Sequence, residues 1–141
     1  MADPRETDRQ AGFTLLEILV VIAILGLLIA LVAPAALRQL SGAKVSIAHQ
    51  SIERLGATLD LYKLDVGDYP TSEQGLQALV EKPEDVTGWN GPYIKGGKVP
   101  TDPWHHTYIY RNPSDRSGHD YDLCSLGPSG QATGSSQICN Q

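Results

Sequence analysis

The chain has 141 residues and a formal net charge of -5. This acidic balance argues against a nucleic-acid-binding surface, which is normally basic. The length suits one small domain, or one domain with an anchor, and the 14 glycines and 9 prolines predict a globular part rich in loops.

The N-terminal part of the chain changes abruptly from polar to apolar. Residues 1–12 are polar, whereas the run from Phe13 to Ala33 is almost uniformly apolar. This run is too long for a strand, and as a helix rising about 1.5 Å per residue it would span roughly 32 Å. Since the hydrocarbon core of a bilayer is about 30 Å thick, the run predicts one membrane crossing.

Two ordinary interpretations of such a run are a cleavable secretory signal and a plain signal anchor. The step Ala33-Pro34-Ala35 resembles a small-x-small cleavage site, but its proline fits poorly and the run is longer than a usual signal core. Neither interpretation explains Glu17, because a carboxylate at the bilayer centre costs about 2.5 kcal/mol or more and usually has a partner. We therefore expect a functional role for Glu17. The alternative is an acid near the membrane edge that reaches the headgroups.

A short motif surrounds this glutamate. The run GFTLLE from Gly12 to Glu17, followed by the apolar stretch and Pro34, resembles the type III signal of type IV pilins and pseudopilins. The resemblance implies that a prepilin peptidase removes residues 1–12 by cleaving after Gly12, and that the new terminus at Phe13 is N-methylated. In that family the glutamate pairs with the N-terminal amine of a neighbouring subunit during assembly, which would give Glu17 its partner.

The leader departs from the family in its charge. Leaders of this kind, and cytoplasmic flanks in general, are usually basic. In residues 1–12 the acids outnumber the bases, because Arg5 and Arg9 stand against Asp3, Glu6 and Asp8.

A second periodic segment follows the apolar run. Past Pro34 and Gly42, apolar positions recur at spacings of three and four, which predicts one narrow apolar stripe on a helix: Val45, Ala48, Ile52, Leu55, Leu59 and Tyr62. We predict a single long helix from about Phe13 to Leu64, loosened or kinked at Pro34, of which the globular part covers only the second half. The alternative is two helices broken at Pro34. His49 falls among the polar positions and is predicted to be a surface residue rather than a ligand.

The rest of the chain predicts short elements joined by turns. Thr71 and Gln74 fit a capping box at the start of a short helix that ends before Pro83. Trp89 and Tyr93, in the glycine- and proline-rich stretch that follows, are expected to fold back onto the core. Residues 107–110 and 121–126 read as the two strands of a hairpin.

Several runs in this half resemble the major (G-type) pseudopilins of type II secretion systems. The matching runs are Leu61–Asp65 with Gly67, Tyr69–Thr71, Glu73–Leu76, Ala78-Leu79, Lys82-Pro83, Gly91–Tyr93, Asp102–Trp104, Tyr121-Asp122 and Ser125–Gly127. These runs favour a pseudopilin over a type IV pilus-type major pilin, which is the alternative. Glu17 separates the chain from the tip pseudopilin, which typically lacks that acid.

The resemblance implies an α+β, pilin-like fold: a long N-terminal helix packed on a small antiparallel sheet, with a short second helix. It implies a leader at 1–12, a transmembrane and polymerisation helix at 13–36, and a periplasmic globular domain at 37–141. The implied function is the major structural subunit of a fibre that grows from the bacterial inner membrane and drives the export of folded proteins. The implied partners are other copies of the chain, minor pseudopilins, the prepilin peptidase and the inner-membrane assembly platform.

The C-terminal tail departs from the family pattern. The family binds calcium in this loop, and calcium needs hard oxygen ligands, several of them charged. Here Gly127-Pro128 is followed by Ser129, the later ligand positions fall at about Ser135–Gln137, and no Asp or Glu occurs from Gly127 to Gln141. We therefore expect the calcium site to be lost and no cofactor to be bound.

The two cysteines of the chain, Cys124 and Cys139, bracket this loop. A pair in an exported protein favours a disulfide, which we expect to replace the ion. A closed loop of about 15 residues would contribute about 3 kcal/mol in the chain-entropy model. The alternatives are two free thiols, or a zinc site with the chain's nearby histidines, for which no ligand spacing is present: His105, His106 and His119.

A rival of a different class is a membrane-anchored periplasmic enzyme. It would need a nucleophile and base pair or a metal cluster, and the sequence pattern indicates neither. Asp120 and Asp122 alternate on an expected strand and would share one face, but no nucleophile accompanies them. We expect no catalytic residues, and we expect one of the two acids to satisfy local backbone donors.

Overall fold

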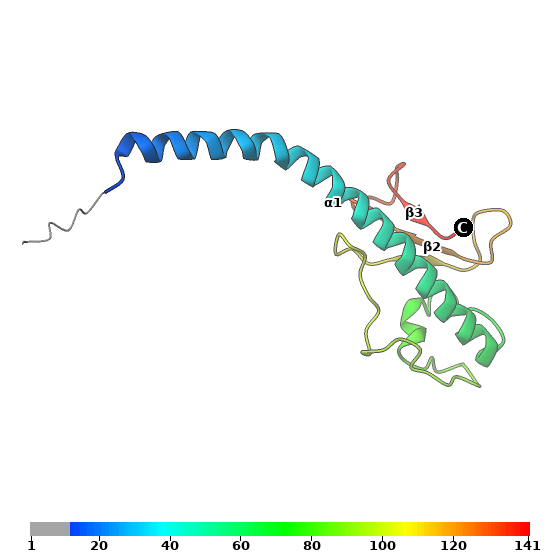
Figure 1. Ribbon diagram of the computed structural model, residues 1–141. Helices are drawn as coiled ribbons and strands as arrows, with labels where there is room; N and C mark the ends of the chain where they lie inside the picture. Colours follow the sequence, from blue (N-terminus) through cyan, green and yellow to red (C-terminus); the bar gives the residue numbers. More distant parts are fainter. Residues whose placement is uncertain (1–11) are drawn as a thin grey trace, which may run out of the picture. The chain divides into compact units, whose positions relative to one another are not determined.

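The computed structural model describes residues 12–141, so the charged leader residues lie outside the described part. The elements follow one another as α1 (Leu15–Val66), the 3-10 helix η1 (Leu76–Leu79), β1 (Ile109–Arg111), β2 (Asp122–Ser125) and β3 (Ile138–Cys139) (Figure 1). The chain divides into two compact units between Leu40 and Ser41, within the length of α1. Each unit is described by itself.

The first unit contains the start of α1. The Thr14 hydroxyl accepts a hydrogen bond from the Glu17 amide at 3.2 Å, and the Thr14 carbonyl accepts one from the Ile18 amide at 3.2 Å. Thr14 thus caps the helix. Glu17 lies in the first turn, where a negative charge interacts favourably with the positive end of the helix dipole. The helix continues through Pro34, so the prediction of one long helix is confirmed.

The side chains of this first part of α1 are mostly exposed. In residues 12–141, α1 is the one helix long and apolar enough to cross a membrane, and none of its most apolar window is buried. A helix that is apolar on all sides and uncovered by its own chain is typical of a segment that is covered by lipid or by other helices.

The second unit contains the core. The α1 residues Ala48, Ile52, Leu55, Leu59 and Tyr62 are buried there, which confirms the predicted stripe at all but its first position. Val45 was predicted to belong to the stripe but is 37% exposed. The core of the described residues begins at Ala48, so Val45 lies just outside it.

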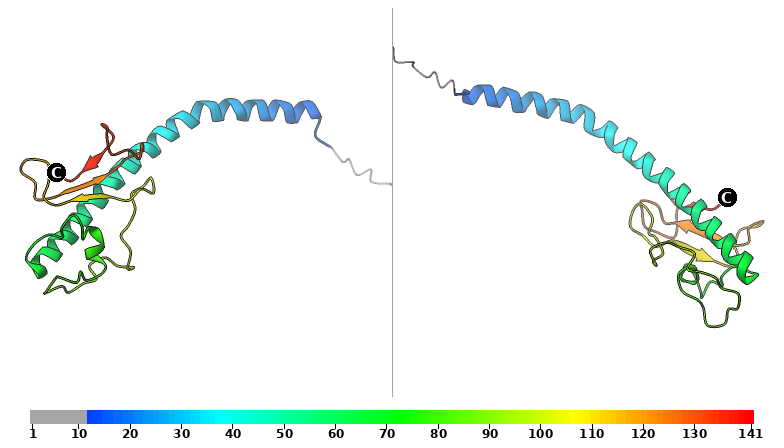
Figure 2. Two further views of the ribbon diagram at one scale, coloured as in Figure 1. Left: turned by 180° about the vertical axis from the view of Figure 1, so that it is seen from behind. Right: turned by 60° about the horizontal axis from the view of Figure 1, so that its bottom comes forward.

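Three antiparallel strands form a sheet in the order β1-β2-β3, and this sheet lies beside the second part of α1 (Figure 2). The register pairs Ile109 with Cys124 and Arg111 with Asp122, so the predicted hairpin is confirmed with β1 shifted by one to two residues. Strand β2 is buried along its whole length.

Strand β3 was missed in the sequence, where the hairpin partner was taken as the last strand. It pairs Cys124 with Cys139 and makes β2 the middle strand of the sheet. Two residues in a polar tail are too short for any periodicity, and only the buried Ile138 carries an apolar signal.

The short second helix is smaller than predicted. Both bonds of the capping box are present: the Thr71 amide donates to Gln74 Oε1 at 3.0 Å, and the Gln74 amide donates to Thr71 Oγ1 at 3.2 Å. A turn follows, and then only the four residues of η1.

The two aromatic residues predicted to fold back explain this early end. Trp89 Nε1 donates to the Ala78 carbonyl at 2.8 Å, and the Tyr93 amide donates to the Leu79 carbonyl at 2.8 Å. These carbonyls would otherwise bond the amides four residues later, and Pro83 has no amide to offer Leu79. Both aromatic rings pack against the core, as predicted.

Candidate functional site

The N-terminal motif lies at the very start of the described chain. Gly12 and Phe13 precede α1 and are exposed, with Phe13 at 78%. A peptidase needs an accessible bond outside a helix, and the bond between these two residues meets that condition. Cleavage after Gly12 and methylation of Phe13 stay predictions.

Glu17 is exposed in the first turn of α1. The capping bond from its amide to Thr14 fixes where this turn begins, and therefore where the carboxylate stands relative to Phe13. The carboxylate of Glu17 thus lies about one helical turn from Phe13. The pairing of Glu17 with a neighbouring amine, and the part of Pro34 in assembly, stay predictions.

At the other end of the chain, Cys124 of β2 and Cys139 of β3 form a disulfide, as predicted from the sequence. The two residues are directly opposite in the ladder, so the bond joins the middle strand to the last strand. The tail from Gly127 to Ile138 is thereby closed into a loop.

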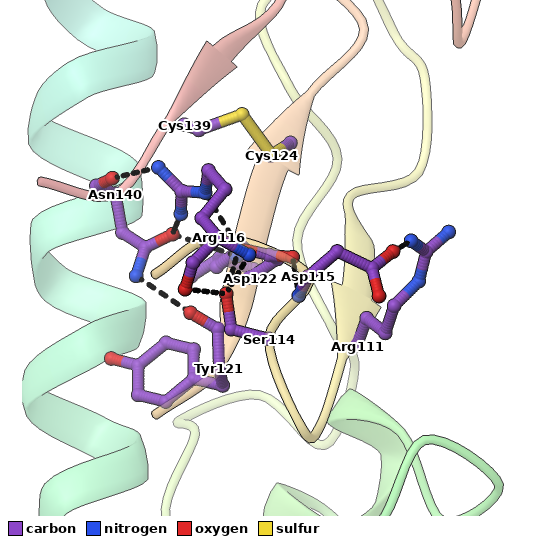
Figure 3. A network of polar contacts seen from close by, with 10 residues as sticks. Arg111, Ser114, Asp115, Arg116, Tyr121, Asp122, Cys124, Cys139 and Asn140 are labelled. Carbon is purple, nitrogen blue, oxygen red and sulfur yellow. Dashed lines mark hydrogen bonds and ion pairs between the residues drawn. A yellow bond between two sulfur atoms is a disulfide. The ribbon is translucent and has the colours of Figure 1, made fainter. Parts of the chain in front are cut away.

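A polar network adjoins the disulfide (Figure 3). The Arg116 guanidinium donates to Asp122 Oδ1 through Nε at 2.6 Å, to the Asn140 carbonyl through Nη1 at 2.8 Å, and to Asn140 Oδ1 through Nη2 at 2.5 Å. We call these three residues the arginine clamp. Through the charge of Arg116, the clamp joins the turn after β1 to the middle strand and to the last residues of the chain.

Asp122 is the acidic member of the clamp and is buried. Its carboxylate also accepts hydrogen bonds from the Ser114 hydroxyl at 2.6 Å and the Asp115 amide at 3.0 Å, which confirms that this acid satisfies a local backbone donor. Burial alone raises the pKa of Asp122. The hydrogen bonds from Ser114 and Arg116, with the positive charge of Arg116 and Arg111, outweigh burial and lower that pKa below its usual value.

Asp120 does not share a face with Asp122, contrary to the sequence prediction. Asp120 precedes β2, is exposed, and lies 4.0 Å from Lys63 Nζ. The strand begins only at Asp122, so the alternation expected of a longer strand does not apply.

The arginine clamp was not found in the sequence. Arg116 lies in a polar turn and Asn140 in a polar tail, and neither position carries a periodic or motif signal. The one signal was Asp122, the only charged residue of β2.

The tail loop closes on itself with neutral groups. Ser129 Oγ and Ser136 Oγ are 2.7 Å apart, and Gln137 Nε2 donates to the Ala132 carbonyl at 2.6 Å. Gly127 has φ +68°, and a Cβ there would lie 2.1 Å from the Ser136 carbonyl oxygen, so only glycine allows this close approach.

These groups do not fit the calcium ion that the family resemblance implies. Calcium prefers several charged oxygens, the loop offers hydroxyls that already bond each other, and residues 12–141 contain no cluster of three His, Cys, Asp or Glu side chains able to hold a metal. The zinc alternative is also unsupported, because both sulfurs are used in the disulfide. His49 is exposed, as predicted.

The fold and the N-terminal motif together define the class as a pilin-like subunit. The structure is similar to that of the major pseudopilin from the type 2 secretion system of enterohaemorrhagic Escherichia coli, with a TM-score of 0.64 and 35% sequence identity. The match covers 74% of this chain and 91% of that chain.

Comparison of sequences then gives the family. Residues 7–33 match the prokaryotic N-terminal methylation motif, and residues 35–141 match the family model of type II secretion system protein G. The type II secretion system core protein G of Pseudomonas aeruginosa is 45% identical over 131 residues, covering 90% of this chain and 89% of that protein. The protein of the same name from Escherichia coli is 42% identical over 139 residues, covering 96% and 94%. The chain belongs to the type II secretion system protein G family, the major pseudopilins.

Proposed function

We propose that this chain is the major structural subunit of a type II secretion pseudopilus. Held in the inner membrane by α1, it polymerises into a periplasmic fibre that drives the export of folded proteins. One observation carries the proposal: a methylation motif at 7–33 and a protein G match at 35–141 occur together on one chain. A type IV pilus-type major pilin is not favoured, because the second match is specific to the secretion family.

The first part of α1 supplies the assembly surface. Within residues 12–141 its apolar side chains have no cover, so lipid tails cover them before assembly and the helices of other copies cover them in the fibre. Since lipid is as apolar as leucine, the move between the two is driven by close packing and polar pairing rather than by the hydrophobic effect.

Glu17 sets the register of this packing. In the apolar interior of a helical fibre, a carboxylate paired with the N-terminal amine of the next copy is tolerated, whereas a subunit in the wrong register leaves two unpaired charges. The prepilin peptidase creates that amine by cutting after Gly12, and the assembly platform in the inner membrane and the minor pseudopilins are the further partners.

The role we propose is structural and not catalytic, and it requires no nucleic acid. Its support is the family, whose members are named as secretion core proteins. The globular part is proposed to face the periplasm, where the disulfide is chemically stable.

We further propose that the disulfide replaces the family's calcium ion in holding the C-terminal tail in place. Both devices attach the same tail to the same sheet. The support is the chemistry of the loop: neutral oxygens bonded to each other, beside a covalent bond between β2 and β3.

The test is secretion by a bacterium in which this chain replaces the resident major pseudopilin. The chain should restore release of secreted proteins into the medium, and E17Q should reduce that release by at least about tenfold, because the neighbouring amine is left unpaired. E53Q, which changes an exposed glutamate of the same helix, is the matched control and should secrete normally. Equal amounts of each variant in the membrane fraction are required. Failure of the unchanged chain would overturn the function, and normal secretion by E17Q would overturn the role of Glu17 alone.

A further inference from the structure

The last residues of the chain are held by contacts that do not involve sulfur. Besides the three bonds from Arg116 to Asp122 and Asn140, the Asn140 amide donates to the Leu123 carbonyl at 2.9 Å, and the Leu123 amide donates to Asn140 Oδ1 at 2.9 Å. Asn140 Nδ2 donates to the Tyr121 carbonyl at 3.0 Å. The side chain of Asn140 thus continues the ladder of β2 where the backbone of β3 ends.

These contacts fix the register of the neighbouring cysteines. In an antiparallel pair, placing Asn140 opposite Leu123 places the preceding residue, Cys139, opposite Cys124. A slip by one residue would turn Cys139 to the other face of the sheet, where its sulfur could not reach Cys124.

The charge of Arg116 is the centre of this arrangement. Its guanidinium gathers one carboxylate and two amide-type oxygens from two separate segments, and hydrogen bonds to charged groups are stronger than neutral ones. The side-chain oxygen Oδ1 of Asn140 accepts hydrogen bonds from both Arg116 and the Leu123 amide, so the two interactions support each other.

We propose that Arg116 is a positioning residue for the disulfide: the arginine clamp docks the C-terminal strand in register before the sulfur–sulfur bond exists, and keeps it docked when that bond is open. This inference goes beyond the proposed function and holds whether or not the chain polymerises. It predicts that the two thiols stand side by side in the reduced protein, so the bond closes as an intramolecular step at high effective concentration.

A small cavity adjoins the disulfide. It has a volume of 240 Å³ and is lined by both cysteines, by Arg116 and by Arg111 of β1. Closure with glutathione disulfide as oxidant proceeds through a mixed disulfide; the two cysteine thiols together lose two electrons and two protons, and the oxidant becomes two glutathione thiols.

Arg111 provides a matched control. It is an arginine that lines the same cavity, but its ion pair is with Asp115 on the surface, and no hydrogen bond in the described residues joins it to the tail. Replacing it removes a nearby charge without touching Asn140.

The experiment equilibrates the full chain, in detergent micelles, with mixtures of reduced and oxidised glutathione. The fraction of closed Cys124–Cys139 bond gives the effective concentration of the thiols. R116M should lower this effective concentration by at least about tenfold, since all three hydrogen bonds from the guanidinium are lost, including the two that hold Asn140. R111M should change it by less than about twofold. R116K, which keeps the charge but not the fork, should lie between them.

A second measurement separates positioning from general stability. In the reduced wild-type chain, the Asn140 amide should exchange its hydrogen slowly, and in reduced R116M it should exchange at least about tenfold faster while the core amides of α1 stay protected. If R116M does not fold, N140A replaces it. This variant removes the bond from Arg116 Nη2 to Asn140 Oδ1 and the two side-chain bonds of Asn140 to Leu123 and Tyr121, and it leaves the pair of Arg116 with Asp122 intact. Equal shifts in R116M and R111M, or free exchange of Asn140 in the reduced wild type, would overturn the proposal.

Discussion

The two parts of α1 are built on opposite principles within one unbroken helix. Between Glu17 and Arg38 the helix carries no polar side chain, and its side chains are mostly exposed. After Ser41 it buries one stripe and turns polar residues outward. The second part has its packing partners in its own chain, whereas the partners of the first part lie outside it. The second unit therefore buries its core within its own chain, whereas the apolar surface of the first unit needs a membrane or further copies to cover it.

The largest expected effect comes from making the same substitution in the two parts. L59A removes a fully buried side chain and should lower the free energy of unfolding of the second unit by about 2–5 kcal/mol. L28A, at a position that is 52% exposed, should leave that free energy within about 0.5 kcal/mol. Trp89 and Trp104 both pack against the core of the second unit, so tryptophan fluorescence of the full chain in detergent reports its unfolding.

An equal loss in L28A and L59A would break the comparison, because it would mean that the first part of α1 also stabilises the second unit. In the secretion assay L28A should reduce the release of secreted proteins, because it alters the assembly surface, although it leaves the fold of the second unit unchanged.

The next effect tests whether the second unit is complete without a ligand. Reduction of the Cys124–Cys139 bond should lower its free energy of unfolding by up to about 3 kcal/mol, since a loop of about 15 residues is released. Removal of calcium with a chelator should change nothing. A lower unfolding midpoint with the chelator, reversed by added calcium, would show that the neutral oxygens of the tail do bind the ion. The second unit would then also depend on a group that its own chain does not supply, namely the calcium ion.

The smallest effect is the pH dependence of the arginine clamp. The folded-state pKa of Asp122 is lowered, so the unfolded chain binds the proton more tightly, and the stability from this carboxylate is present above the ordinary value of 3.8 and lost as the pH falls through the lowered pKa. Below about pH 4 the free energy of unfolding should therefore fall less in D122N than in the wild type. The difference should be on the order of 1 kcal/mol, typical of one hydrogen bond. D120N, at an exposed acid, should keep the wild-type profile, and identical profiles for D122N and the wild type would contradict the assignment.

Features with a repeating or chemically distinct signal were predictable from the sequence. The long helix, the buried stripe, the hairpin, the capping box and the disulfide each follow from a period, a turn or a pair of cysteines. The roles of Gly12, Phe13, Glu17 and Pro34 rest on a motif whose chemistry involves other molecules, so the structure of one chain leaves them as predictions.

What the sequence did not predict depends on contacts between distant residues. The end of η1 is set by Trp89 and Tyr93, which donate hydrogen bonds to carbonyls eleven and fourteen positions earlier in the chain. The arginine clamp joins Arg116 to Asn140 across the sheet, and β3 is too short to show a pattern. Each is a tertiary effect that overrides or completes a weak local preference.

The brevity of the outer strands has a consequence for how copies can associate. A sheet whose edges are long and unpaired invites strand addition and amyloid-like growth. Here β2 is enclosed on both sides, and the free edges belong to strands of three and two residues, one of which carries Arg111. So few open ladder groups give an incoming strand little to bind. A protein whose work requires high local concentrations of identical copies is in this way protected from joining sheet to sheet, and helix packing is left as the route of growth.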